Sequence, residues 1–89
     1  MGCVAQGPEL REELMRAVDL ALAGDWERAH AIVQKHEDDA TACWMHAVLH
    51  KIEGDESNSR YWYRRSSQAY EAYAEPKTEL AAIKAALGY

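Results

Sequence analysis

The chain has 89 residues, of which 48% are hydrophobic and 28% charged, with a formal net charge of −5 at neutral pH. This length holds one domain, and the apolar content exceeds that of disordered chains, so we expect a single globular unit over residues 1–89. The acidic balance excludes nucleic acid and anionic membranes as expected partners, because both are bound through clustered Lys and Arg.

No apolar run approaches the roughly 18 residues that span a bilayer, and the N-terminus lacks the basic-then-apolar layout of a secretory signal. The two cysteines, Cys3 and Cys43, make no disulfide framework. We therefore expect a cytoplasmic protein with reduced thiols and no membrane partner.

Apolar residues recur every three or four positions along the chain, and β-branched residues are few, which predicts an all-α fold. A flexible tail over residues 1–7 precedes five predicted helices, which span residues 9–23, 26–36, 40–53, 56–74 and 76–88. The first four helices form two αα-hairpins, over residues 9–36 and 40–74. The fifth helix, 76–88, is predicted to cap the open end of the stacked hairpins.

A Gly-Asp pair marks the turn inside each predicted hairpin. Gly24 can take the left-handed conformation that closes one helix, and the Asp25 side chain can cap the next. Gly54 and Asp55 repeat this arrangement. The apolar stripes predicted to face the core extend to the helix ends and include Leu22, Trp26 and Ile52.

Shifting the sequence by 30 residues aligns one hairpin with the other, which indicates an internal repeat. One such hairpin is too small to bury its own apolar stripe, so two must stack. The aligned pairs are Met15 and Met45, Ala17 and Ala47, Val18 and Val48, Leu22 and Ile52, Gly24 and Gly54, Asp25 and Asp55, and Ala29 and Ser59.

The small residues and the turns of this repeat resemble those of the tetratricopeptide repeat. The resemblance covers residues 10–70, with departures at Arg16, Cys43 and His46. It implies stacked helical hairpins with a grooved surface that binds a peptide or another subunit. The residues that carry it are Ala17, Gly24, Asp25 and Ala29 in one copy, and Ala47, Gly54, Asp55 and Ser59 in the other.

A second resemblance runs through "AHAIVQ" (29–34), "WMHAVLHKIEGD" (44–55) and "YWYRR" (61–65). These stretches are similar to a group of short, uncharacterised proteins known mainly from genome sequences. This resemblance implies no activity.

One helix carries four residues that can bind a metal. Cys43, His46, His50 and Glu53 fall within an arc of about 80° on the predicted helix 40–53. Two histidines four residues apart can share a Zn²⁺ ion, with Cys43 or Glu53 as a third ligand. A fourth ligand could come from the neighbouring hairpin, where His30 lies. The other interpretation is that His46 and His50 make hydrogen bonds to acidic or tyrosine partners across a helix pair.

The stretch around residues 60–65 carries three arginines beside aromatic residues. The helical periodicity directs Arg60, Tyr61, Arg64 and Arg65 outward, where they can contact an acidic partner. Alternatively, these arginines pair with neighbouring Glu and Asp of the same chain.

The sequence contains no phosphate loop, nucleophile elbow or paired acid motif, so we expect no enzyme. We predict a non-catalytic protein-interaction or adaptor module without a cofactor, whose partner is a protein or peptide. Self-association is a variant, because the ends of a two-hairpin array expose apolar edges. The alternative function is zinc binding through His46 and His50.

Overall fold

The computed structural model describes residues 8–88. Its α-helices are α1 (Pro8–Leu22), α2 (Trp26–Val33), α3 (Ala40–Glu53), α4 (Glu56–Arg64) and α5 (Pro76–Gly88), and a short 3-10 helix spans Tyr70–Ala72. No strand occurs between residues 8 and 88, so the prediction of an all-α fold with five helices is confirmed. The predicted tail, residues 1–7, lies outside the described residues.

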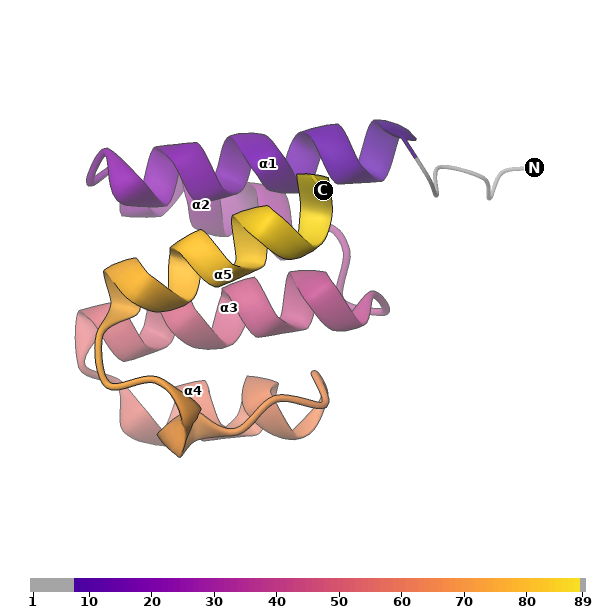
Figure 1. Cartoon of the computed structure of the whole chain (residues 1–89). Helices are drawn as coiled ribbons and strands as arrows, with labels where there is room; N and C mark the ends of the chain where they lie inside the picture. The colour runs from indigo at the N-terminus through magenta and orange to yellow at the C-terminus, as the bar shows by residue number, and fades with distance from the viewer. Residues whose placement is uncertain (1–7, 89) are drawn as a thin grey trace.

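Helices α1 and α2 form one hairpin and α3 and α4 form the other, and the hairpins meet where α2 packs against α3 (Figure 1). Helix α5 packs mainly against α1 and α3, and Figure 1 shows it crossing the space between them. The sequence placed this helix at the open end of the stack. Instead, α5 covers the surface that the first helices of the two hairpins form together.

Both Gly-Asp turns are built as their residues predict. Gly24 and Gly54 have φ angles of 89° and 84°, in the left-handed region that favours glycine. The carboxylates of Asp25 and Asp55 each accept a hydrogen bond, 3.3 Å long, from the backbone N–H three residues later. Each aspartate therefore caps the second helix of its hairpin.

The predicted helix 56–74 is too long, because the helix ends at Arg64. The Ser66 hydroxyl donates to the Tyr63 carbonyl and accepts from a backbone N–H two residues later. Ser67 then takes a φ of 71°, which a helix does not allow. The Ser66 side chain thus replaces helical hydrogen bonds here, and the positive φ of Ser67 turns the chain back toward α5.

The predicted helix 26–36 is also too long, because α2 ends at Val33. The backbone N–H groups of Lys35 and His36 donate to carbonyls three residues earlier, so the chain tightens into turns. These turns lead to Asp39, whose extended backbone and carboxylate cap the start of α3.

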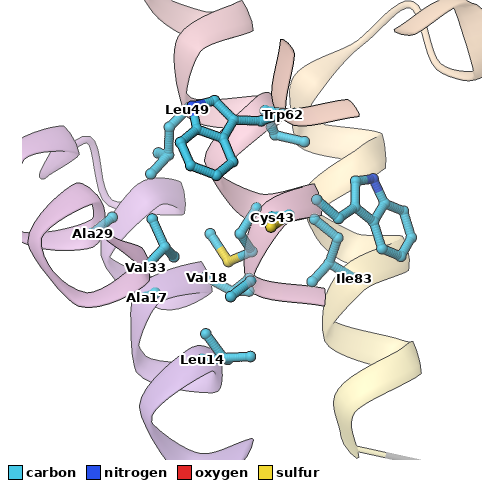
Figure 2. Packing of buried hydrophobic residues seen from close by; sticks show 14 of the residues in the cluster. Leu14, Ala17, Val18, Ala29, Val33, Cys43, Leu49, Trp62 and Ile83 are labelled. Carbon is cyan, nitrogen blue, oxygen red and sulfur yellow. The ribbon is translucent and has the colours of Figure 1, made fainter. Parts of the chain in front are cut away.

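The core lies where the hairpins and α5 meet. Figure 2 shows Val18 and Val33 of the first hairpin converging on Leu49 of α3 and Ile83 of α5. These four side chains are fully buried or nearly so. They therefore hold α1, α2, α3 and α5 to one another by apolar burial.

Three residues expected in the apolar stripes are less buried than predicted. Leu22 and Ile52 are 40% and 43% exposed, and Trp26 is half-buried. Leu22 and Ile52 stand in the last turns of α1 and α3 and line one open cleft with Pro76. They protrude there because α5 only begins at this end of the bundle.

Candidate metal centre

Three histidines from two helices meet at the contact between the hairpins. His30 lies on α2, and His46 and His50 lie one turn apart on α3. One ring nitrogen of each lies within 4.8 Å of the others. The Nε2 atoms of His30 and His46 are only 3.1 Å apart. These three residues are the histidine cluster, and they are three of the five metal ligands that the sequence suggested.

Two tryptophan rings enclose the histidine cluster. The Trp26 ring stacks on His30 at a centroid distance of 4.7 Å, and the Trp62 ring stacks on His46 at 4.0 Å. The Trp26 indole N–H donates to the Leu49 carbonyl over 2.6 Å, which fixes its ring in place. Rigid aromatic stacking thus orients two of the three imidazoles.

His46 is the most buried member, at 3% exposure, and its Nδ1 has no hydrogen-bond partner among the described residues. Burial, together with the neighbouring His30 and His50, lowers its pKa to about 3. Burial also lowers the pKa of His30. Both rings are therefore neutral at pH 7, which is the protonation state that binds a metal.

Glu53 was predicted as a ligand, but its carboxylate is engaged by a histidine. The His50 Nδ1 lies 2.6 Å from a Glu53 oxygen. This contact fixes the His50 tautomer and leaves Nε2 as the nitrogen with a free lone pair. A carboxylate that orients a histidine in this way is typical of the residues surrounding a metal centre.

Cys43, the other predicted ligand on α3, does not belong to the histidine cluster. Its thiol donates to the Glu37 carbonyl over 3.2 Å, toward the segment that connects α2 and α3. Burial raises the pKa of the Cys43 thiol, which opposes formation of the thiolate that metals bind. The sequence arc was broad enough to include Cys43, but the packing of α3 directs it elsewhere.

The predicted partner-binding residues have unequal freedom to contact another molecule. Arg60 forms ion pairs with Glu56 at 2.7 Å and Glu71 at 2.9 Å, and lies over the Tyr70 ring. Arg60 therefore pairs with acidic residues of its own chain, as the alternative interpretation of the sequence expected.

The other three residues of this predicted contact lie on the exposed side of α4 and just beyond it. Tyr61 is 44% exposed, and Arg64 and Arg65 are exposed as well. The Arg65 guanidinium lies over the rings of Tyr61 and Trp62, at 5.8 and 5.5 Å from their centroids. The structure thus brings Tyr61 and Arg65 together, beside the tryptophan that stacks on His46.

A buried carboxylate that the sequence analysis did not single out lies elsewhere in the core. Glu79 of α5 is fully buried and accepts hydrogen bonds from Trp44 at 2.8 Å and Tyr63 at 2.7 Å. Lys51 donates to its other oxygen over 2.9 Å. Burial and the adjacent carboxylate raise the pKa of Tyr63, which keeps its hydroxyl protonated as a donor.

The Glu79 network joins α3, α4 and α5 through charge-assisted hydrogen bonds. Lys51 extends it by donating to the carbonyls of Tyr70 and Tyr73, so all three ammonium hydrogens have acceptors. Glu79 lies four residues before the inward-facing Ile83, so both side chains share one face of α5. This spacing was the signal in the sequence that Glu79 would be buried. Because its polar groups find their hydrogen-bond partners within the protein, the network serves to hold the helices together.

None of the helices within residues 8–88 has the length and apolar character needed to cross a membrane. Comparison of the chain with known protein families, with curated proteins and with solved structures finds no match. The resemblance to the tetratricopeptide repeat therefore stays a prediction, and a functional assignment rests on the residues themselves.

Proposed function

We propose that this protein binds a divalent transition-metal ion of the zinc type through His30, His46 and His50. The observation that carries the proposal is the convergence of three imidazole nitrogens within 4.8 Å. Two of them come from one helix, as expected for histidines four residues apart, and the third comes from the other hairpin.

The spacing of the His30 and His46 nitrogens suits a tetrahedral ion. Two nitrogens at about 2.0–2.1 Å from one zinc ion lie about 3.3 Å apart. The Nε2 atoms of His30 and His46 are 3.1 Å apart, so they need to separate by only a few tenths of an ångström. The His50 nitrogen lies within 4.8 Å of the other two, so its ring has to move closer for all three to share one ion.

The chemistry of the site also favours a metal. Neutral imidazoles suit zinc, copper, nickel and cobalt, whereas calcium and magnesium prefer oxygen ligands. Glu53 adds the outer hydrogen bond that metal-binding histidines make.

The exposed group formed by Tyr61, Arg64 and Arg65 favours a second function, docking of an acidic protein or peptide. Its support is the exposed tyrosine with a guanidinium lying over its ring. Replacing Arg64 and Arg65 with Glu should abolish such docking and leave metal binding unchanged. A binding assay with an acidic peptide and the double variant tests this role separately.

The metal proposal is tested by calorimetric titration of Zn²⁺ into chelator-treated protein. We expect one ion per chain with a dissociation constant of about 1 μM or below. The variants His30→Gln and His46→Gln/His50→Gln should lose this binding. His30→Gln is the milder change, since His30 is half-buried, and circular dichroism would check that each variant is folded.

The fourth histidine supplies a matched control. His36 lies away from the histidine cluster, with its Nε2 2.9 Å from the Glu13 carboxylate. His36→Gln should therefore bind Zn²⁺ as the unaltered protein does. Equal affinity in the His36 and His30 variants would show that the ion binds elsewhere, and the proposal would be wrong.

A further inference from the structure

The histidine cluster offers three ligands, whereas a zinc-type ion binds four. Among residues 8–88, no fourth His, Cys, Asp or Glu joins all three histidine nitrogens at the same mutual distance. The identity of the fourth ligand determines whether the metal is sealed in protein or can react with small molecules.

Each nearby side chain that could complete the set already has another partner. The Cys43 thiol donates to the Glu37 carbonyl, and the Glu53 carboxylate accepts from His50. A second group of possible ligands combines His50 and Glu53 with Asp55, but Asp55 caps α4 through Asn58. Recruiting either carboxylate would break one of these contacts.

The remaining walls of the cluster supply no ligand. The rings of Trp26 and Trp62 stack on His30 and His46, and an indole N–H can only donate. The Trp26 N–H is also occupied by the Leu49 carbonyl. These rings therefore leave the fourth position to a molecule from solvent.

Access to the cluster is one-sided. His46 and His50 are 3% and 8% exposed, whereas His30 is half-buried. Solvent therefore reaches the cluster beside His30, along α2. Because the other two imidazoles are buried, a ligand that reaches a metal held by all three must be small.

We infer that a metal bound by His30, His46 and His50 keeps one exchangeable coordination position, which water or a small monovalent anion occupies. This inference rests on the proposed metal binding. It assigns a ligand class, because a cationic metal enclosed by neutral imidazoles and indoles attracts small anions. Ligand exchange at this position replaces water by the anion without any redox step.

The test uses Co²⁺ as the metal and azide as the probe anion. Tetrahedral Co²⁺ has a visible absorption spectrum that reports its ligands. The full chain is loaded with one equivalent of Co²⁺ and titrated with sodium azide, with sodium chloride as the ionic-strength control. We expect a saturable change in the position and intensity of the bands, with one azide bound per metal.

The variant Glu53→Ala, saturated with Co²⁺ to offset its weaker metal binding, separates an open position from one filled by Glu53. If the fourth position is exchangeable, the unaltered protein and the variant both respond to azide. If only the variant responds, Glu53 is the fourth ligand and the inference is overturned. A Co²⁺ spectrum that azide changes in neither protein also overturns it.

The failure of the proposed function gives a different result. In that case, Co²⁺ produces no tetrahedral spectrum before azide is added, and the inference fails together with the metal site. A spectrum that forms in the unaltered protein and is absent from His30→Gln retains the proposed function, whatever azide does.

Discussion

The Nε2 atoms of His30 and His46 lie 3.1 Å apart, although the two residues belong to different hairpins. At this distance one imidazole must donate and the other accept, because two lone pairs would repel each other. A metal ion would replace this single hydrogen bond by coordination to both rings. It would then connect α2 to α3 directly.

Metal binding should consequently stabilise the fold. A ligand that binds only the folded state adds about 2.7 kcal/mol to the free energy of unfolding at a concentration 100 times its dissociation constant. Thermal unfolding with and without Zn²⁺ measures this change. His36→Gln should show the full increase in melting temperature and His30→Gln none. An equal increase in both variants would place the ion away from the histidine cluster.

Glu53 should tune metal affinity without binding the metal. Replacing the outer hydrogen-bond partner of a metal-binding histidine typically weakens binding by about 10–100-fold. We expect this loss for Glu53→Gln, because Gln retains the hydrogen-bonding geometry with His50 but not the charge. Calorimetric titration measures the affinity, with Glu27→Gln on the exposed side of α2 as a control. Complete loss of binding in Glu53→Gln would make Glu53 a ligand.

The metal-free protein should lose stability on acidification. The pKa of His46 is about 3 in the folded protein, below its ordinary value of 6.5, because burial and the facing His30 and His50 oppose its charge. Below about pH 6.5 the unfolded chain therefore binds a proton that the folded chain does not, and stability falls as the pH decreases toward 3. Between pH 7 and 5 this effect costs about 1–2 kcal/mol.

Urea unfolding in the presence of a chelator measures this pH dependence. Glu53, hydrogen-bonded to His50, is the acidic group nearest the cluster, and the indole of Trp62 on the other face of His46 is uncharged. The decrease in the free energy of unfolding between pH 7 and 5 should be smaller in a His46→Gln variant that still folds. It should be unchanged in His36→Gln. If the pH dependence of stability were unchanged in His46→Gln, other titrating groups would be its cause.

The Lys51–Glu79 pair should be necessary for stability. Removing one partner of a buried ion pair leaves an uncompensated charge and typically costs about 3–5 kcal/mol. We expect Lys51→Met to destabilise the protein by about this amount, because Glu79 is fully buried and Lys51 is only 10% exposed. Lys77→Met, at an exposed position on α5, should have little effect in the same urea unfolding experiment.

The predicted helix ends were correct where a residue with a strong conformational or capping preference, such as Gly or Asp, marks them. Gly54 ends α3 and Asp55 caps α4, as their conformational preferences require. The ends of α2 and α4 were predicted too far along the chain. After Val33 the polar residues 34–36 include no Gly or Pro to mark the end of α2, and after Arg64 the periodic apolar pattern continues past the last helical residue of α4. At α4 the hydrogen bonds of Ser66 decide the ending, and hydrophobic periodicity contains no signal for them.

The candidate site was partly predictable. The spacing of His46 and His50 places them on one face of any helix, so their proximity followed from the sequence. The meeting with His30 depends on how α2 packs against α3, which periodicity does not determine. The same limit explains Cys43, which shares the predicted arc with His46 but contacts the connecting segment at Glu37. Pairing of Lys51 with Glu79 likewise depends on the position of α5.

The most direct test of the metal centre is the X-ray absorption fine structure of the zinc-loaded protein. We predict three imidazole nitrogens at about 2.0–2.1 Å and one further oxygen or nitrogen ligand, with no sulfur at about 2.3 Å. A sulfur ligand would assign the ion to a site containing cysteine. A shell of oxygen atoms alone would indicate binding by surface carboxylates, and either result would contradict a three-histidine centre.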